Sequence, residues 1–425
     1  MSSENGTNRV VVAVACTLLM LNLGTVYAWS FFQKPLCETY GWSNSQVVWT
    51  FSLAICFLGL SAAAGGLLLP RMGPRPLALT GALLFGSGYL VAALALRMHS
   101  LPLLYLGYGI TGGIGLGLGY VTPVATVSRW FPDRKGLATG TVVMGFGFGA
   151  LLMSKVIAPF LLAWVNGDMV LAFTVMGVLF LALSLASAAF IRNPPASWLP
   201  PHDPAKTVTD TDALWVSAGS CIVSTPFALM WLIFFCNITA GIALIGFQSP
   251  LFQDVCAMHD PALGKEALGA YGGTLIAASS VFNGIGRFFW GAFSDRLGRR
   301  RTFSLILGSQ IAAFALLMQT SHPWLFATLV CYILLCYGGG FGTMPSFVLD
   351  MFGARFMPAV YGAILTAWSA AGIAGPQLVA MMKDRYSGQP GLASFYSFAA
   401  AICFLGTGLF LSFLLKERRM GKITS

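Results

Sequence analysis

Apolar residues follow one another in long runs along this chain, and short polar segments separate the runs. An α-helix needs roughly 20 apolar residues to cross the hydrocarbon core of a bilayer, and each run is long enough to form such a helix. We therefore predict an all-α membrane protein with twelve transmembrane helices. These helices are expected near residues 10–32, 45–69, 76–96, 102–127, 136–164, 168–191, 226–249, 268–293, 302–320, 323–349, 358–383 and 393–415.

The composition points to the same environment. Hydrophobic residues make up 57% of the 425 residues and charged residues 9%, whereas a soluble domain has about 25% charged residues. Only the lipid bilayer can cover so much apolar surface. The 9 cysteines are scattered without a metal-binding spacing, so we interpret them as small hydrophobic residues. We expect no metal, no cofactor and no enzymatic activity.

Two glycine-rich stretches, 113–119 and 145–149, lie inside predicted helices. A phosphate-binding loop would follow a strand and be followed by Lys and then Ser or Thr, and neither stretch has these features. Small residues let membrane helices approach closely, so we interpret the glycines as sites of packing between the fourth and fifth helices. Hydrolysis of ATP is therefore not expected to drive this protein.

The charged residues predict the orientation in the membrane. The chain has 24 basic and 14 acidic residues, which gives a net charge of +10. If the amino terminus is cytoplasmic, most basic residues fall in loops and tails on the cytoplasmic side, where such loops are retained. We predict that both termini are cytoplasmic and that the protein lies in the plasma membrane, which in bacteria is the inner membrane. The basic excess then reflects topology, and no nucleic-acid partner is expected.

A polar, proline-rich segment divides the predicted helices into two groups of six. It includes Pro194, Pro195 and Pro200, which favour an extended linker over a helix. We predict an N-terminal six-helix bundle at 1–191, a cytoplasmic linker at 192–225 and a C-terminal six-helix bundle at 226–425.

Two loop sequences recur in the two groups. Gly66-Leu-Leu-Leu-Pro-Arg-Met-Gly-Pro-Arg75 follows the second predicted helix, and Gly291-Ala-Phe-Ser-Asp-Arg-Leu-Gly-Arg-Arg300 follows the eighth at an offset of 225 residues. Arg129-Trp-Phe-Pro-Asp-Arg-Lys-Gly136 follows the fourth helix, and its echo Asp350-Met-Phe-Gly-Ala-Arg355 follows the tenth. Two features in the same order at nearly one offset indicate a duplicated six-helix unit, which is typical of secondary transporters.

The pattern Gly-x-x-x-Asp-Arg-x-Gly-Arg-Arg resembles the signature of the major facilitator superfamily. The copy at 291–300 is complete, whereas the copy at 66–75 has Pro70 in place of the aspartate. The stretches 129–140, 224–231 and 282–291 resemble the oxalate/formate antiporter branch, which is related to the monocarboxylate transporters. The resemblance implies two six-helix bundles around a central cavity, one of which rocks against the other to give alternating access.

Charged residues of the repeated loops are the candidates for a conformational gate. They can pair with the ends of neighbouring helices in one conformation and separate in the other. The alternative is that they only anchor and orient their helices. The gating candidates are Asp295, Arg296, Arg300, Arg71, Arg75 and Asp133.

One arginine interrupts the eighth apolar run. Arginine at bilayer depth costs roughly 2.5–3.5 kcal/mol on insertion scales, so a membrane protein keeps it where it faces a cavity and meets an anion. Asn283 and Arg287 are four residues apart and share one helix face, and a guanidinium group can hold a carboxylate with two parallel hydrogen bonds. The alternative is that Arg287 reaches the headgroups or pairs with a backbone carbonyl. The resemblance favours the anion site, because the family's substrate-binding arginine falls on this position.

Two departures from the resembling carriers bear on the cargo. The oxalate carriers have a second cation, a lysine in the eleventh helix, and aligning Tyr361-Gly362 places Trp368 at its position. A dianion that faces a single arginine keeps an uncompensated buried charge, so we expect a small monoanion. The animal monocarboxylate carriers have an aspartate at the position of Asn283, so the charged pair that couples protons there is incomplete here.

Further candidates fall on positions that line the cavity of the resembling carriers. Tyrosine hydroxyls can donate to a carboxylate, and ring faces can pack on a guanidinium group. Core packing or a lipid-facing position is the alternative for each aromatic residue. Gln248, two residues before Pro250, is a further polar candidate. The aromatic candidates are Tyr27, Trp29, Tyr120, Tyr337 and Phe341.

These features predict a secondary transporter of small monocarboxylates such as lactate, pyruvate or formate, working as a monomer by alternating access. Proton coupling and anion exchange both remain open, since the 14 acidic residues lie in loops, tails or helix ends. One alternative is an oxalate or dicarboxylate exchanger of the same branch. The other is a non-transporting membrane receptor that keeps the carrier fold.

Overall fold

The computed structural model describes residues 8–131, 135–195, 217–353 and 356–415. Within these ranges the chain forms helices joined by short turns, and no strand is present, so the all-α prediction is confirmed. The helices up to residue 195 are called the first half. They are α1 (Arg9–Leu23), the 3₁₀ segment η1 (Gly24–Ala28), α2 (Trp29–Tyr40), α3 (Asn44–Met72), α4 (Pro74–Arg97), α5 (Leu101–Leu104), the π-helical η2 (Tyr105–Gly112), α6 (Gly113–Trp130), α7 (Lys135–Leu152), the π-helical η3 (Met153–Ile157), α8 (Ala158–Trp164) and α9 (Met169–Ala189).

The helices after residue 217 are called the second half. They are α10 (Ala218–Ile222), α11 (Thr225–His259), α12 (Lys265–Leu297), α13 (Arg299–Leu317), α14 (Pro323–Phe352), α15 (Met357–Ile364), α16 (Thr366–Arg385) and α17 (Pro390–Leu414). Segments that follow one another with little bend, such as α1, η1 and α2, form one rod.

Ten helical rods of the described chain are long and apolar enough to cross a membrane, by length and composition. The predicted multi-pass character is therefore confirmed. α12 and α13 are not among the ten. α12 carries Asn283 and Arg287, and α13 opens on three consecutive arginines from Arg299, so both are less apolar than the rest. That these two helices also cross the bilayer remains a prediction.

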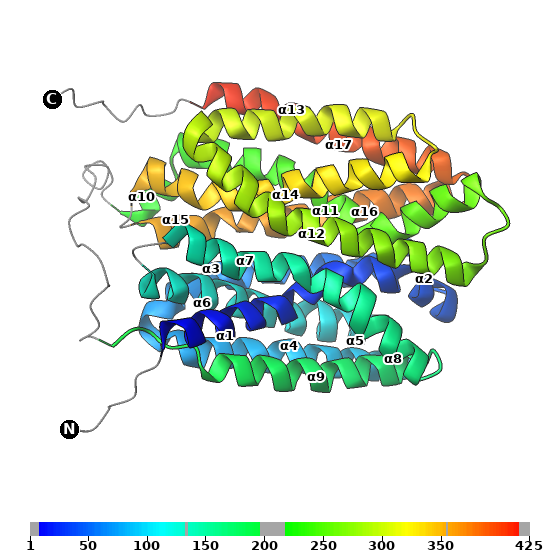
Figure 1. Ribbon diagram of the computed structural model, residues 1–425, viewed down its shortest axis with the longest axis horizontal. Helices are drawn as coiled ribbons and strands as arrows, with labels where there is room; N and C mark the ends of the chain where they lie inside the picture. The colour runs from blue at the N-terminus through cyan, green and yellow to red at the C-terminus, as the bar shows by residue number, and fades with distance from the viewer. Residues whose placement is uncertain (1–7, 132–134, 196–216, 354–355, 416–425) are drawn as a thin grey trace.

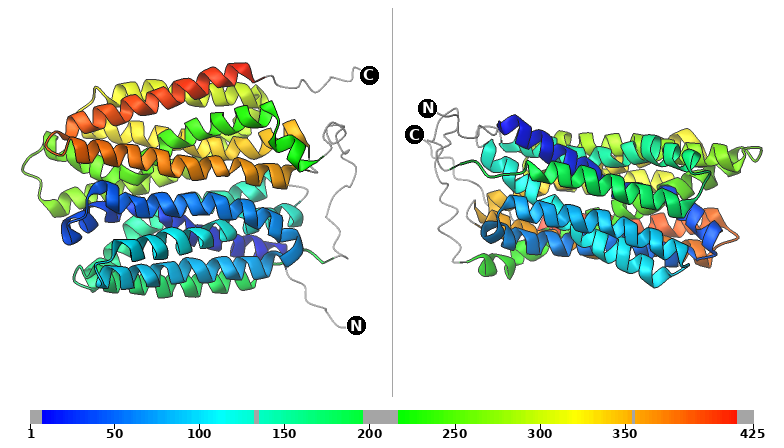
Figure 2. Two further views of the ribbon diagram at one scale, coloured as in Figure 1. Left: turned by 180° about the vertical axis from the view of Figure 1, so that it is seen from behind. Right: turned by 90° about the horizontal axis from the view of Figure 1, so that it is seen from below.

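The long helices run roughly side by side, with the first half forming one layer and the second half the other (Figure 1). Figure 2 shows the same separation from behind. α1 begins and α17 ends at one end of the molecule, which we call the terminal face. α2 and the turns α8–α9 and α11–α12 lie at the opposite end, which we call the distal face. The bundle boundaries at 191 and 226 remain predictions.

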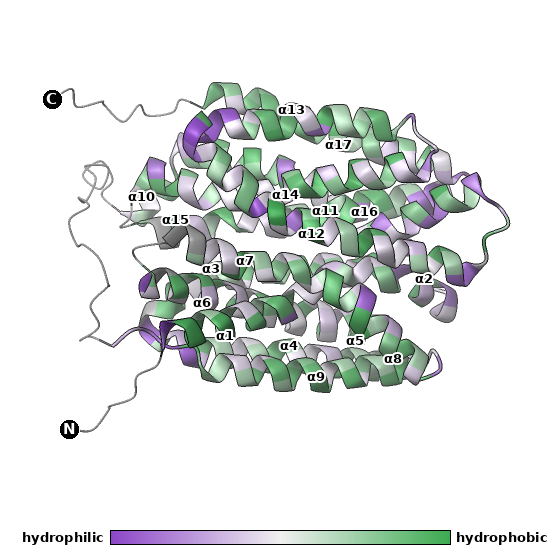
Figure 3. Ribbon diagram, viewed as in Figure 1, coloured by the Kyte–Doolittle hydropathy of each residue, from purple (hydrophilic) through white to green (hydrophobic). Residues whose placement is uncertain are grey.

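Hydrophobic residues dominate the helix surfaces between these two faces, and hydrophilic residues gather toward the ends (Figure 3). On α12 the side chains of Phe282, Ile285 and Phe288 are exposed. They lie on the side of the helix away from Arg287, which is buried. The apolar belt therefore extends over α12, as a lipid-facing surface requires.

The two halves meet chiefly along two helix pairs, and α2 also packs on α11. α3 packs on α16, and α7 packs on α12. At the α7–α12 crossing a Cβ added to Gly147 would lie 2.8 Å from the Cα of Gly284, so α7 needs a glycine at position 147 to approach α12 this closely. The glycine stretches thus do serve close packing, but the expected partners were wrong, because the closest approaches of these glycines do not join α6 and α7 to each other. The closest approaches of α7 are to α1, η1 and α12, and those of α6 are to α1, α3 and α4.

The two copies of the repeated loop share one backbone conformation. Gly73 ends α3 with φ 77°, and Gly298 ends α12 with φ 92°. Both values lie in the left-handed region that only glycine adopts without strain. Each glycine reverses the chain so that α4 or α13 begins at the next residue. The offset of 225 residues in the sequence is therefore matched in the structure.

Several boundaries differ from the prediction. The first helix was expected to end near residue 32, but α2 continues through Pro35 to Tyr40. The seventh helix was expected to end near residue 249, but α11 continues through Pro250 to His259. A proline ring crowds the carbonyl four residues earlier; here that residue is Gly246, and membrane helices absorb such a break. In the predicted linker, residues 196–216 lie outside the described chain, while Ala218–Ile222 form the short helix α10, capped by Ser217 and Ser220.

Candidate functional site

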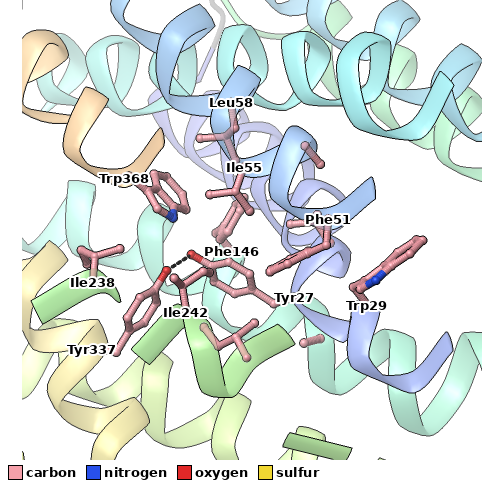
Figure 4. Close-up of a cluster of buried hydrophobic side chains, with 14 of the residues drawn as sticks. Tyr27, Trp29, Phe51, Ile55, Leu58, Phe146, Ile238, Ile242, Tyr337 and Trp368 are labelled. Atoms are coloured by element: carbon pink, nitrogen blue, oxygen red, sulfur yellow. Dashed lines mark hydrogen bonds between the residues drawn. The ribbon is translucent and has the colours of Figure 1, made fainter. Parts of the chain in front are cut away.

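Side chains from both halves meet in the interior, where η1, α6 and α7 approach α12, α14 and α16. Figure 4 shows Tyr27, Phe146, Tyr337 and Trp368 converging on one point. We call this group the central cluster. It comprises Tyr27, Tyr120, Phe146, Asn283, Arg287, Tyr337, Phe341 and Trp368, and all of these side chains are buried.

Arg287 is the charged member of the central cluster, and it is 3% exposed. Its Nε donates to Oδ1 of Asn283 over 3.5 Å, a long hydrogen bond. Its guanidinium carbon lies 5.0 Å from the ring centre of Phe341 and 5.8 Å from that of Phe146. Nη1 and Nη2 are buried and have no hydrogen-bond partner in the described part of the chain. A cation with two unpaired donors is therefore held between two aromatic rings.

Glycines of α14 fix the position of this cation. A Cβ on Gly338 would lie 3.0 Å from the carbonyl carbon of Asn283, and a Cβ on Gly342 would lie 2.9 Å from the Cα of Arg287. α14 can therefore approach the backbone of α12 at the two residues that form the anion-site candidate. Helical side chains tilt toward the amino terminus of their helix, so the guanidinium group of Arg287 points toward Asn283.

Three tyrosines lie close to the guanidinium group, namely Tyr120, Tyr27 and Tyr337, and the Tyr120 hydroxyl interacts with it most strongly without completing a hydrogen bond to Nη1 or Nη2. The hydroxyls of Tyr27 and Tyr337 are hydrogen-bonded to each other over 2.8 Å, across the two halves. The Tyr120 ring packs edge-on against Phe146, with a centroid distance of 5.3 Å. Hydroxyl groups from both halves thus lie beside the single cation.

Trp368 closes the central cluster from α16. Its ring lies 4.6 Å from Phe341 and 5.5 Å from Tyr120, centre to centre. Its indole nitrogen is buried and lacks a hydrogen-bond partner among the described residues, and Figure 4 shows that nitrogen turned toward the Tyr27–Tyr337 pair. The indole group adds one more unpaired N–H donor, but no charge.

Trp29 is not brought into the central cluster. Its Nε1 donates to Oε1 of Gln33 over 3.1 Å, and its ring packs on Tyr108 at 4.7 Å. In Figure 4 it stands apart from the converging side chains. Residues two apart on a helix do not share a face, so Trp29 cannot follow Tyr27 into the centre.

Gln248 lines a small cavity beside the central cluster. Ser279 Oγ donates to Oε1 of Gln248 over 2.6 Å. Tyr27 and Asn283 line the same cavity, so it adjoins the cluster. About 10 Å³ is open to the centre of a water molecule, which is roughly the least volume that holds one water. A larger molecule can enter only if the two halves or their side chains move.

The gating candidates lie at the terminal face. Asp295 pairs with Arg299 over 2.6 Å, and Arg299 pairs with Asp350 of α14 over 2.9 Å. Arg299 also donates to Ser294. These partners all belong to the second half, so in this conformation the described contacts tie α12, α13 and α14 together.

Arg296, Arg71 and Arg75 are exposed. Arg300 donates to the carbonyl of Leu415 over 3.4 Å. Asp133 lies outside the described residues.

Two residues of these sites were missed by the sequence analysis. Phe146 lies within the glycine stretch 145–149, and an aromatic residue beside glycines is a signal for a cavity position, but Phe148 carries the same signal. Arg299 was passed over for its neighbours Arg296 and Arg300. Only the fold shows which of the consecutive arginines reaches both Asp295 and Asp350.

Comparisons with known proteins agree with this architecture. The family model of the Major Facilitator Superfamily matches residues 12–376. A solved structure of a bacterial homologue of the human lysosomal transporter Spinster, inward-facing and unoccupied, superposes with a TM-score of 0.69 at 18% identity, covering 97% of this chain and 98% of that chain.

Three curated relatives carry names for small organic anions. The oxalate:formate antiporter of Oxalobacter formigenes is 28% identical over 410 residues, covering 93% of this chain and 91% of the relative. The apicoplast pyruvate carrier 1 of Toxoplasma gondii is 26% identical over 84% of this chain and 73% of its own. Monocarboxylate transporter 11 of Homo sapiens is 26% identical over 90% of this chain and 78% of its own.

Proposed function

The chain belongs to the Major Facilitator Superfamily, and from that premise we propose that it is a secondary transporter of small monocarboxylate anions. Members of this superfamily are membrane transporters and not enzymes. The specific cargo is inferred from the central cluster. The proposed substrate-binding residues are Arg287, Asn283, Tyr120, Tyr337, Tyr27, Phe341, Trp368, Phe146 and Gln248.

The two unpaired terminal nitrogens of Arg287, Nη1 and Nη2, carry the proposal. A buried charge without a partner is costly, and a carboxylate would satisfy both free nitrogens with two parallel, charge-assisted hydrogen bonds. Headgroups do not satisfy them, because the side chain is 3% exposed. The hydroxyls of Tyr27, Tyr120 and Tyr337 can donate to the same carboxylate.

The number of charges favours a monoanion. Arg287 is the single cation of the central cluster, and Trp368 contributes an N–H group without charge. A monocarboxylate bound to Arg287 forms a neutral pair, whereas oxalate would keep one negative charge buried. Because the chain is 28% identical to an oxalate:formate antiporter, a dicarboxylate exchanger is the second candidate.

The small cavity favours a substrate that is larger than formate. Asn283, Gln248 and Ser279 line it, whereas Arg287 does not, so a substrate whose carboxylate binds Arg287 would extend past Asn283 to reach it. The Ser279 hydroxyl and the Gln248 amide can bond a second oxygen, as in lactate or pyruvate. The halves must separate slightly to admit it.

Transport is proposed to follow alternating access of the two halves around this site, in a monomer. The terminal face carries the arginines of the repeated loops and is proposed to be cytoplasmic, as the positive-inside rule implies. The protein would then lie in the plasma membrane with both termini inside. Proton symport and anion exchange are both compatible with a neutral anion–arginine pair.

Uptake of labelled lactate, pyruvate, formate and oxalate into proteoliposomes, with and without a pH gradient, tests the proposal. We expect monocarboxylate uptake by the wild type and none by Arg287→Ala at matched protein levels. Oxalate exchange as fast as lactate transport would favour the dicarboxylate exchanger. Absence of uptake of all four anions would favour the non-transporting receptor.

A further inference from the structure

The carboxylate of Asp384, in the second half, binds the first turn of α3, in the first half. Asp384, near the end of α16, accepts four hydrogen bonds from the start of α3. Its Oδ1 accepts from the backbone N (3.0 Å) and Nδ2 (3.1 Å) of Asn44. Its Oδ2 accepts from the backbone N (2.9 Å) and Oγ (2.5 Å) of Ser45.

These donors are ones that α3 cannot satisfy by itself. The first N–H groups of a helix have no partner within the helix and carry the positive end of its dipole. Ser43 accepts from the backbone N of Gln46, three residues into the turn. Asp384 accepts from the backbone amides of Asn44 and Ser45, the two residues before Gln46. The first turn of α3 is therefore capped jointly by Ser43 and by the opposite half.

Both sides of the contact are held in place. Lys383 pairs with Asp254 of α11 over 2.5 Å, with both side chains largely buried, and this pins the end of α16 within the second half. Gln33 of α2 donates to the carbonyl of Asn44 over 3.0 Å, which pins the start of α3 within the first half. The Asp384 contact therefore joins two braced elements.

The neighbouring contacts across the distal face are weaker. Lys155 of η3 donates to Thr274 of α12 over 2.5 Å, and both residues are exposed. Lys265 and Glu38 are 3.4 Å apart and mostly exposed. Exposed ion pairs contribute little, whereas hydrogen bonds from backbone amides to a carboxylate are strong.

We propose that Asp384, together with Asn44 and Ser45, is the latch that holds the distal face closed, so that breaking these four bonds is the step that opens it. The proposal rests on alternating access, but not on the nature of the cargo. Rocking the halves apart would separate α16 from α3 and return the carboxylate and the helix amides to water. The latch thus sets the balance between the closed and open distal face.

Hydrogen exchange of the substrate-free protein, followed by mass spectrometry, tests the latch. Asp384→Asn removes the charge and turns one acceptor atom into a donor, which corresponds to roughly a 10- to 100-fold rise in the opening equilibrium. We expect a rise of that size in exchange at the start of α3 and also at the remote contact between η3 and α12. Asp260→Asn is the matched control, because Asp260 is an exposed carboxylate of the same face that accepts from Ala262 in its own turn.

Hydrogen exchange at the remote contact between η3 and α12 distinguishes a latch from a simple helix cap. Faster exchange confined to the first turn of α3, or none anywhere, would overturn the proposal. Ser45→Ala removes the hydroxyl donor alone and should act in the same direction with a smaller effect, which keeps the test valid if Asp384→Asn fails to fold. Because no substrate is used, failure of carboxylate uptake would leave this result intact.

Discussion

Replacing Arg287 with methionine should make the empty protein more stable while removing its response to substrate. The guanidinium group is compensated in the structure by one 3.5 Å hydrogen bond to Asn283 and by the rings of Phe341 and Phe146. A weak hydrogen bond contributes about 1 kcal/mol and the two rings about 1–2 kcal/mol together. Desolvation of the charge costs several kcal/mol. The difference predicts that Arg287→Met raises the free energy of unfolding by about 1–3 kcal/mol.

Bound substrate should make the wild type more stable than Arg287→Met. Two charge-assisted hydrogen bonds to a carboxylate contribute about 3–6 kcal/mol, at 1.5–3 kcal/mol each. Their loss in Arg287→Met corresponds to roughly a 10²- to 10⁴-fold weaker affinity. Arg287→Lys keeps the charge but loses the planar fork, so one bond is lost and affinity falls roughly 10- to 100-fold.

Thermal unfolding of the purified protein in detergent, with and without saturating lactate, measures both effects. At about 100 times the dissociation constant, lactate should stabilise the wild type by about 2.7 kcal/mol and leave Arg287→Met unchanged. A methionine variant that is less stable than the empty wild type would show that the arginine is structural. Normal lactate uptake by the methionine or lysine variant in proteoliposomes would remove Arg287 from the site.

Trp368→Lys should weaken monocarboxylate transport and admit oxalate, which a competition assay measures; robust oxalate exchange by the wild type would contradict the charge argument. Asp295→Asn frees one side of Arg299 and should change the transport rate without changing the order of substrate preference, and a changed order would place this loop in the binding site. Gln248→Leu removes the acceptor for Ser279 and should lower lactate uptake relative to formate; an equal loss for both would assign the cavity a structural role. Exchange of internal for external monocarboxylate should be faster than net uptake without a pH gradient, and equal rates would show that the empty protein reorients freely.

The fold could be predicted because its strongest signal is local. A run of apolar residues long enough to cross the bilayer forms a helix wherever it lies, since the bilayer leaves backbone groups no other partner. Helix ends carry no comparable signal in this chain. The seventh apolar run predicted a helix end near residue 249, yet α11 continues through Pro250 to His259. Proline weakens a membrane helix at one position, and tertiary contacts decide whether the helix continues.

The candidate site likewise has one part that the sequence predicts and another that only the fold reveals. Arg287 could be found because one charge in an apolar run has few physical explanations, and the structure buries it with Nη1 and Nη2 unpaired. Phe146 could not be distinguished from Phe148, two residues later, because both are aromatic residues between glycines. Which of the two faces Tyr120 depends on the rotation of α7, which is set by its crossings with α1 and α12. The Asp384 contact joins residues 340 positions apart in the sequence, so no local sequence pattern predicts it.

The charges of the central cluster and of the distal face impose related conditions on transport. The empty protein buries an arginine whose terminal nitrogens are unpaired, so any occluded empty state retains the desolvation cost of a bare charge. A bound monocarboxylate removes that cost by forming a neutral pair, and the loaded protein can therefore occlude more easily than the empty one. The distal latch stabilises closure whether or not substrate is bound, because Asp384 contacts α3 and not the central cluster. Because substrate does not contact the latch, substrate binding cannot break it, and its strength must be small enough for thermal motion to open the distal side. A latch made of four hydrogen bonds to two residues is consistent with that limit, since opening it breaks only a few contacts.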